Sequence, residues 1–345
     1  MIKHAFLDDY SEGCHPAILD ALANTNLAQQ PAYGDDPYSV EARALIQAQV
    51  GLHDVPIYFV SGGTLANLII IASALRPHEA VISAHSGHIA LWETGAIEAT
   101  GHKIISCPSD DGKLTPALVN EALAQHSQYP HVAKPRLVYI SNATEVGTIY
   151  SKHELTALAA TCRQNELLLM LDGARLGPAV CAPDSDLTLS DVAKLCDVFW
   201  IGGTKAGALI GEAIVIPNAQ LAVDFRFHIK QRGALLAKGR LLGLQFKTLF
   251  SDDLFFAVNR HANAMAQKLS RGFIDRGFAL FAPTQSNQVF PILEQDAIDQ
   301  LRSSFSFHDW EPVDAGRMAV RFVTSWATQD EHIDALLHAL DALQR

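Results

Sequence analysis

The chain has 345 residues, 49% of them hydrophobic, which is enough for two domains with a sizeable core. Its formal net charge of −11, without a basic stripe, argues against a nucleic-acid partner. No apolar run approaches the roughly 20 residues of a membrane helix, and the N-terminus lacks the apolar core of a signal peptide, so we expect a cytoplasmic protein with no membrane contact.

The first two thirds of the chain alternate between strand-like and helix-like patterns. Apolar runs predict strands, with the turns that follow them, at 56–63, 79–88, 102–108, 136–144, 167–174 and 198–203. Amphipathic stretches predict helices at 64–75, 89–100, 116–126 and 152–166. This alternation is typical of an α/β protein with a mostly parallel sheet and helices on both faces.

After residue 217 the pattern changes. It predicts a long helix at about 219–249, a second helix at 255–277, short strands at 278–283, 288–293 and 317–326, and a C-terminal helix at 330–345. We therefore expect a large domain at 15–240 and a smaller α+β domain at 241–345. We expect the N-terminal segment, 1–14, to pack across both domains.

Polar residues follow the predicted strands at 61–64, 85–88, 142–145, 172–175 and 204–205. In an open parallel sheet, ligands bind beyond the carboxyl ends of the strands, so we expect these residues to meet in one site. The turn SGGTLAN at 61–67 opens a helix, whose backbone N–H groups and Thr64 hydroxyl suit a phosphate dianion. A plain tight turn with Thr64 as N-cap is an equal alternative.

Asp172 and Lys205 are the two most informative charged residues. Asp172 ends an apolar run and needs a positive partner, either Arg175 or the protonated ring nitrogen of a cofactor. Lys205 follows an apolar run among glycines, where desolvation lowers the pKa of an amine and makes it nucleophilic, although a surface lysine is the common alternative. A phosphate site, an aspartate and a lysine together match the needs of pyridoxal phosphate, so the sequence predicts this cofactor.

Two further side-chain types refine the prediction. His88 lies between a predicted strand and a predicted helix, where it can stack on a cofactor ring, move a proton or bond to the helix backbone. The five cysteines are scattered without paired spacing, so we expect neither a disulfide framework nor a metal site.

The motifs YGDDPYS, SGGTLAN, HSGHIALWETGA, DGARLG and GGTKAGALIGEA resemble, in this order, the L-threonine aldolase family. That family lies in the β-eliminating lyase group of fold-type I pyridoxal-phosphate enzymes, and the resemblance runs from about residue 5 to the end. It implies that Lys205 bonds to the cofactor aldehyde, that Asp172 faces the ring nitrogen and that His88 stacks on the ring. It also implies that Gly63 and Thr64 bind the phosphate.

The same resemblance implies the substrate contacts. Arg175 would reach the substrate beside the cofactor, Arg321 would grip its carboxylate, and His131 would lie near its hydroxyl. The SDT or SDN of many members is DDY here, at 8–10. Asp8 would repel a carboxylate, so Ser11 is the candidate substitute.

Two other segments depart from the family pattern. SNATEVG, at 141–147, stands where many members have ENTHN, so Thr144 and Glu145 replace a polar pair near the cofactor. The basic segment 228–240 lacks the family form GGGMRQAG, and its cations are candidates to reach the phosphate of a neighbouring subunit: Lys230, Arg232, Lys238 and Arg240.

The resemblance implies a lyase that cleaves the Cα–Cβ bond of L-threonine or L-allo-threonine-type β-hydroxy-α-amino acids to glycine and an aldehyde. Another pyridoxal-phosphate reaction on the same scaffold, β-elimination or transamination, is the alternative. A binding protein that kept the fold without catalysis is a third interpretation. A homodimer or homotetramer is implied by the family alone, and His88, His131 or a bound water is the expected base.

Overall fold

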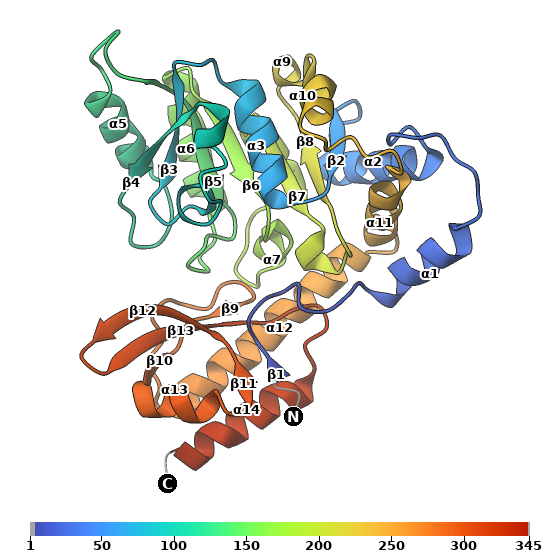
Figure 1. Cartoon of the computed structure of the whole chain (residues 1–345). Helices are drawn as coiled ribbons and strands as arrows, with labels where there is room; N and C mark the ends of the chain where they lie inside the picture. Colours follow the sequence, from blue (N-terminus) through green and yellow to red (C-terminus); the bar gives the residue numbers. More distant parts are fainter. Residues whose placement is uncertain (1–3, 344–345) are drawn as a thin grey trace.

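A seven-stranded sheet forms the centre of the larger lobe in the computed structural model, which describes residues 4–343 (Figure 1). Its strand order is β2 (Ile57–Val60), β8 (Glu212–Val215), β7 (Val198–Gly202), β6 (Leu168–Asp172), β5 (Lys134–Ser141), β3 (Glu79–Ala84) and β4 (Lys103–Cys107). Strand β8 is antiparallel to both of its neighbours, and the other pairings are parallel. The expected α/β fold with a mostly parallel sheet is confirmed.

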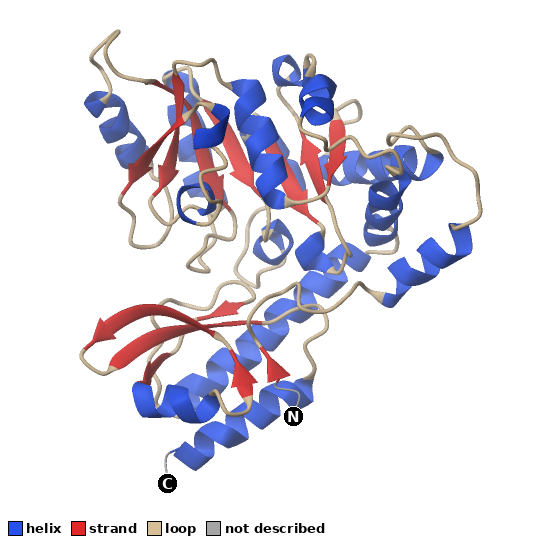
Figure 2. Cartoon of the chain, in the orientation of Figure 1, coloured by secondary structure: helices blue, strands red, loops and turns tan. Residues whose placement is uncertain are grey.

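Helices cover both faces of this sheet (Figure 2). Along β6, Leu169 and Leu171 belong to one hydrophobic core, and Leu168 and Met170 belong to another. This alternation arises because successive side chains of a strand point to opposite faces. The first core takes in α2 (Pro37–Val50), α5 (Pro116–Gln125), α6 (Lys152–Gln164), α8 (Leu189–Leu195) and α11 (Arg240–Phe250), and the second takes in α3 (Gly63–Ala74) and α10 (Phe225–Gln231).

The prediction of one long helix at 219–249 is wrong. The segment forms α9 (Ala219–Ala222), α10 and α11, separated by turns. Asp224 has φ +58° and Gly233 has φ +72°, and neither value continues a right-handed helix. Gly239 lies close to Gly34: a Cβ added to Gly239 would be 2.4 Å from the backbone nitrogen of Gly34. Tertiary packing thus divides a stretch that looks helical by composition.

The prediction of a helix at 89–100 is also wrong. Only α4 (His88–Leu91) and a short 3₁₀ turn, η1 (Glu98–Thr100), form there. Between them Thr94 and Gly95 have φ values of +53° and +73°. The tight turn brings Glu93 back beside His88, which matters for the site described below.

The smaller lobe is an α+β unit, as expected. Its antiparallel sheet contains β10 (Ile292–Glu294), β13 (Arg317–Val323) and β12 (His308–Asp314), with β9 (Gln288–Val289) also paired to β13. It packs with α12 (Leu254–Asp275), α13 (Gln295–Leu301) and α14 (Asp330–Leu343). The strand expected at 278–283 forms only an isolated bridge between Leu280 and Pro291.

The division between the two lobes falls later in the chain than residue 240. Phe246, Phe255 and Val258 belong to the large-lobe core, whereas Met265 and Leu269 belong to the small-lobe core. Helix α12 therefore begins in one lobe and ends in the other. We propose a domain boundary inside α12 in place of the expected one, because α11 packs against α2.

The N-terminal segment joins the lobes. Strand β1 (His4–Ala5) pairs in parallel with β11 (Phe305–Ser306), and Phe6 lies in the small-lobe core. The backbone N–H of His15, just before α1 (Pro16–Thr25), donates to the carbonyl of Gly207 in the large lobe. The residues between these two anchors cross the space where the lobes meet.

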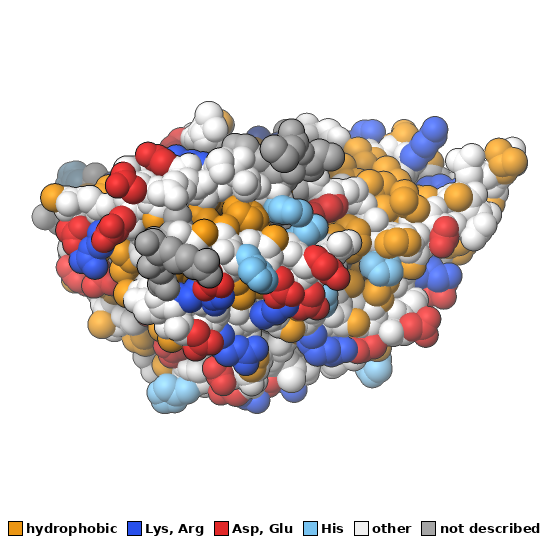
Figure 3. Space-filling view, turned by 90° about the horizontal axis from the view of Figure 1, so that it is seen from below, with side chains coloured by type: hydrophobic (Ala, Val, Ile, Leu, Met, Phe, Trp, Pro, Cys, Tyr) orange, Lys and Arg blue, Asp and Glu red, His pale blue; other side chains and the backbone are white. Residues whose placement is uncertain are grey.

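Charged side chains of both signs lie on the surface, as the composition of 26 basic and 37 acidic residues suggests. Figure 3 shows one face, on which acidic and basic side chains are interspersed. Within residues 4–343, no helix combines the length and apolar character needed to cross a membrane.

Candidate active site

Two adjoining cavities lie at the carboxyl ends of the parallel strands, where the lobes meet. The inner cavity, of about 340 Å³, is lined among others by Ser61, Thr64, His88, Asp172, Glu212 and Lys205. The outer cavity, of about 350 Å³, extends toward the small lobe and adds Asp8, Trp92, His308, Trp310 and Arg321. Both are bordered by Tyr10, His88, Glu145, Arg175 and Lys205. Most of the expected site residues thus meet in one place.

Lys205 lies in the short turn η2 (Thr204–Ala206) directly after β7. The turn is close-packed: a Cβ on Gly202 would lie 2.5 Å from the Ala174 carbonyl oxygen. Among the described residues, the Lys205 amine has no hydrogen-bond or ion-pair partner, and it lies 5.7 Å from the Tyr10 ring centre. Burial, reinforced by the charge of Arg175, lowers the pKa of Lys205. The surface-lysine alternative does not hold, because the amine lines both cavities.

Asp172 ends β6 as a buried carboxylate. It accepts hydrogen bonds from the Tyr139 hydroxyl at 2.6 Å, from Asn67 Nδ2 at 2.9 Å and from the backbone N–H of Ala174 at 3.0 Å. Its expected alternative partner, Arg175, does not contact it and pairs elsewhere. The Asp172–Arg175 ion pair is therefore wrong, and the Asp172 carboxylate borders the inner cavity.

Arg175 pairs with Asp9, a residue that the sequence interpretation passed over. Arg175 Nε and Nη2 donate to the two oxygens of Asp9 at 2.8 and 3.1 Å, and Asn287 donates to the same carboxylate at 2.8 Å. Burial by itself would raise the pKa of Asp9, but the charges of Arg175 and Lys205 outweigh it and hold that pKa below its ordinary value. Asp9 is the middle residue of DDY, so the shared aspartate of the SDT and SDN motifs was the available signal.

The N-terminus of α3 faces the inner cavity. Gly62 is its N-cap and provides no side-chain cap, and Thr64 is exposed in the first turn, so the N-cap alternative for Thr64 is wrong. A Cβ on Gly63 would lie 2.7 Å from the Trp200 ring, so any larger residue here would have to displace that ring. The first-turn N–H groups lack intrahelical partners, as at any helix start, and are free to bind an anion.

Glu212 borders the same end of the cavity and was not anticipated. Strand β8 places it opposite Val60 and Gly202, where it accepts hydrogen bonds from the Thr204 hydroxyl at 2.9 Å and the Gly203 N–H at 3.0 Å. Burial raises the pKa of Glu212 to about 8. Glu212 lies in the motif GGTKAGALIGEA, but its place in the site depends on β8, the single antiparallel strand of the seven-stranded sheet.

His88 begins α4 with its ring against Glu93. The distance from His88 Nδ1 to Glu93 Oε1 is 2.8 Å, so the ring contacts a carboxylate and not the helix backbone. Burial by itself would lower the pKa of His88, but the hydrogen bond to Glu93 and the charge of Asp172 raise it above its ordinary value. Glu93 was not singled out by the sequence, because the turn that returns it to His88 was interpreted as helix.

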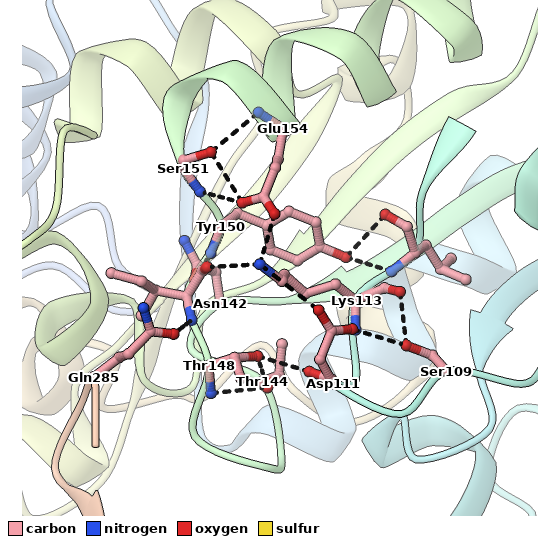
Figure 4. Close-up of polar contacts among 12 residues, drawn as sticks. Ser109, Asp111, Lys113, Asn142, Thr144, Thr148, Tyr150, Ser151, Glu154 and Gln285 are labelled. Atoms are coloured by element: carbon pink, nitrogen blue, oxygen red, sulfur yellow. Dashed lines mark hydrogen bonds and ion pairs between the residues drawn. The ribbon is translucent and has the colours of Figure 1, made fainter. Parts of the chain in front are cut away.

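Glu145 lies between the cavities. Its Oε1 accepts hydrogen bonds from the Ser141 hydroxyl at 2.7 Å and the His88 N–H at 2.9 Å, and its Oε2 is buried without a partner among the described residues. Burial raises the pKa of Glu145. The loop that carries it is held by polar contacts that include Thr144–Thr148 at 2.7 Å and Asn142–Tyr150 at 3.2 Å (Figure 4).

Arg321, on β13, brings a cation from the small lobe. Its guanidinium lies 5.3 Å from the Trp310 ring centre, and its Nε is buried without a partner. Burial, with the charge of Arg175, lowers the pKa of Arg321. Within residues 4–343 no carboxylate pairs with this guanidinium, so it suits a carboxylate ligand in the outer cavity.

Two expected residues lie outside the cavities of this chain. His131 is exposed in the loop before β5, at the amino end of the strand, whereas the cavities lie at its carboxyl end. Ser11 is exposed, and its hydroxyl donates weakly to the Asp8 carbonyl at 3.4 Å. Asp8 and Tyr10, its neighbours, border the outer cavity instead. The roles implied for His131 and Ser11 therefore stay predictions.

Comparison with known proteins decides the family. A model of the beta-eliminating lyase family matches residues 6–323. The chain belongs to this family. This lyase-family chain is 35% identical over 337 residues to the low specificity L-threonine aldolase of Pseudomonas aeruginosa, covering 95% of this chain and 94% of that protein.

Solved structures agree with that family membership. The structure of Leishmania major threonine aldolase matches with a TM-score of 0.97 and 47% identity, over 99% of this chain and 100% of that one. Thermus thermophilus aspartate aminotransferase shares the fold alone, with a TM-score of 0.74 at 14% identity over 99% of this chain and 91% of that one. The lyase-family chain thus has the fold-type I architecture, as expected.

Proposed function

We propose that the chain is a pyridoxal-phosphate-dependent lyase that cleaves L-threonine-type β-hydroxy-α-amino acids to glycine and an aldehyde. One observation carries the proposal: Lys205 presents an unpartnered amine with a lowered pKa in the cavity that also contains the Asp172 carboxylate. Two relatives named threonine aldolases that span nearly the whole chain support the same reaction.

The residues of the inner cavity fit the proposed cofactor. The open first turn of α3 at Gly63 and Thr64 suits its phosphate, Asp172 suits its ring nitrogen, and Lys205 suits its aldehyde. His88 borders the cavity from β3's carboxyl end and suits a ring face. When bound, this group takes up the electron pair that is released as the Cα–Cβ bond breaks.

The outer cavity suits the substrate. Arg321 would bind its carboxylate, while Arg175 is committed to Asp9 and would act by holding the N-terminal segment in place. His88 is the base that the structure favours, because it borders both cavities and His131 borders neither. Glu145 accepts a hydrogen bond from the backbone N–H of His88 and thereby orients that residue.

The deciding experiment measures aldehyde release from each of the four threonine stereoisomers, with purified protein and added pyridoxal phosphate. We expect release from the L isomers alone. Formation of 2-oxobutyrate and ammonia without aldehyde would favour β-elimination. Formation of 3-hydroxy-2-oxobutyrate when a 2-oxo acid is added as amino acceptor would favour transamination. No product and no bound cofactor would favour a non-catalytic binding protein.

Lys205→Ala tests the central residue. We expect aldehyde release to fall by at least about 1,000-fold, because within residues 4–343 no other lysine lines the inner cavity. Lys194→Ala removes an exposed lysine on α8 and is the matched control, with turnover unchanged. Turnover by Lys205→Ala close to that of the unmodified protein would contradict the proposal.

We further infer a homodimer or homotetramer in which a basic residue of 228–240 reaches the neighbouring phosphate. Arg240 is engaged within its own chain with the Thr25 and Ala28 carbonyls, so Lys230, Arg232 and Lys238 are the better candidates. Phe227, on the same segment, is 75% exposed. Light scattering of the purified protein would test this assembly. The cytoplasmic location stays a prediction.

A further inference from the structure

A buried amide connects the two carboxylates that serve the proposed cofactor and base. Asn67 Nδ2 donates to Asp172 Oδ2 at 2.9 Å and to Glu93 Oε1 at 2.8 Å. Its Oδ1 accepts from the Trp200 indole N–H at 3.0 Å. Glu93 Oε1 also lies 2.8 Å from His88 Nδ1, so a continuous chain of contacts runs from Asp172 to His88.

The orientation of the Asn67 amide follows from these contacts. The indole N–H of Trp200 can only donate, so the atom facing it must be the amide oxygen. The amide nitrogen, which carries two hydrogens, then faces one oxygen of each carboxylate. The reverse orientation would place a carbonyl oxygen against two carboxylates and two donors against each other. Asn67 is 1% exposed, so water offers no substitute.

The same logic fixes the tautomer of His88. Glu93 Oε1 accepts a hydrogen bond from Asn67 and also contacts His88 Nδ1. A carboxylate oxygen can only accept, so the ring nitrogen that contacts it must donate. His88 Nδ1 therefore carries the hydrogen, and Nε2 is left as the nitrogen that can take up a proton. The Glu93 side chain is fully buried, whereas the His88 side chain is 39% exposed and borders the inner cavity. The ring edge with Nδ1 faces Glu93, so we place Nε2 on the ring edge toward the cavity.

Given the proposed lyase function, we propose that Asn67 is a positioning residue. It holds Asp172 and Glu93 as hydrogen-bond acceptors, and through Glu93 it keeps His88 Nε2 free to receive the substrate proton. The cofactor-ring side and the base side of the site thus share one amide. Asn67 lies one helical turn after Gly63 on α3, so the helix that would bind the phosphate also sets this link.

The apo protein provides the first test, because it needs no turnover. Asn67→Ala deprives Glu93 of a donor and leaves its Oε1 to accept more strongly from the His88 ring. We expect the pKa of His88, followed by NMR, to rise in Asn67→Ala. The other charged groups that act on His88, Asp172 and Lys205, remain in the variant.

Asn263→Ala is the matched control. Asn263 is 2% exposed on α12, and its Nδ2 donates to the Pro178 carbonyl at 2.9 Å, an acceptor that does not titrate. The pKa of His88 in Asn263→Ala should equal that of the unmodified protein. An unchanged pKa of His88 in Asn67→Ala would overturn the proposal. If Asn67→Ala does not fold, Asn67→Ser keeps one donor and gives the same comparison.

The second test uses the holoenzyme. The pH at which kcat/KM falls on the acid side should shift in Asn67→Ala and stay constant in Asn263→Ala, because only the first alters the surroundings of His88. An unshifted profile would overturn the link to His88. If the unmodified protein releases no aldehyde, the proposed function fails, but the NMR titration of His88 still decides whether Asn67 acts on His88 through Glu93.

Discussion

At the scale of single residues, the site depends on carboxyl and amino groups held away from water. Lys205 and Glu212 illustrate both directions of the effect, because burial lowers the pKa of the amine and raises that of the carboxyl. Both shifts favour the uncharged form. In the inner cavity, burial thus favours the neutral forms of the Lys205 amine and the Glu212 carboxyl.

Glu212→Gln tests whether the Glu212 carboxyl is neutral. The pKa of Glu212 is raised by burial from 4.5 to about 8, so the folded protein keeps a proton that the unfolded chain has lost. Stability should then decrease as the pH rises from about 4.5 toward 8, since the folded state binds more protons there. Glu212→Gln should raise the Tm of the apo protein near pH 8 and change it little near pH 5, as followed by thermal unfolding.

The matched control for that variant is Glu311→Gln, which alters an exposed glutamate on β12. Its Tm should follow that of the unmodified protein at both pH values. A Tm of Glu212→Gln that is lower than that of the unmodified protein near pH 8 would show that the carboxyl is ionised and stabilising in the fold.

At the scale of secondary-structure elements, the start of α3 decides whether a phosphate site exists. The helix packs against the Trp200 ring of β7 through Gly63, and its first-turn N–H groups stay open because Gly62 provides no cap. The strand-to-helix turn was readable from SGGTLAN. The need for glycine at 63 came only from a ring 137 positions away in sequence (200 − 63).

Gly63→Ala should weaken both the fold and the anion site. Its Cβ would lie 2.7 Å from Trp200, and overpacking of this kind costs about 1–3 kcal/mol. We expect a lower midpoint in urea and weaker binding of pyridoxal phosphate, measured by absorbance titration. Gly62→Ala is the stability control, because its Cβ meets nothing within 4 Å. Equal stability of the two variants would contradict this account.

At the scale of the whole molecule, the ion pair between Asp9 and Arg175 links the N-terminal segment to the turn between β6 and α7 (Leu176–Val180). Asp9 and Arg175 come from parts of the chain 166 positions apart, and Asn287 of the small lobe completes the cluster. The segment begins in the small-lobe core at Phe6 and ends against the large lobe at His15. The geometry of the outer cavity therefore depends on both lobes.

Asp9→Asn tests that link. Breaking a buried ion pair by removing one partner costs about 3–5 kcal/mol, and Arg175 would stay charged. The pKa of Asp9 is held below its ordinary 3.8, so its contribution is fully present above that value and is lost as the pH falls through the lower, folded value. Chemical denaturation should show the full loss near pH 7 and a smaller one in strong acid.

The exposed pair Asp35–Arg226 offers the comparison. Its two side chains are 57% and 48% exposed, so Asp35→Asn should change the free energy of unfolding by less than about 1 kcal/mol. A loss in Asp9→Asn no larger than this would contradict a structural role for the buried pair.

The sequence by itself determined the features that depend on neighbours along the chain. Lys205, Asp172 and Gly63 were identifiable because each follows an apolar strand, and the carboxyl ends of parallel strands share one edge of the sheet. The alternation of strands and helices fixed the fold class for the same local reason.

Tertiary structure alone decided the features that depend on distant packing. Asp9, Asn67 and Glu212 reach the site from the N-terminal segment, a helix interior and an antiparallel strand. Their motifs DDY, SGGTLAN and GGTKAGALIGEA are visible in the sequence, but the partners of these three side chains are set by packing. The broken helix at 219–249 has the same origin, because its turns are set by contacts with residues such as Gly34. Burial creates the shifted pKa values and the unpartnered amine, and burial exists only once the lobes have packed.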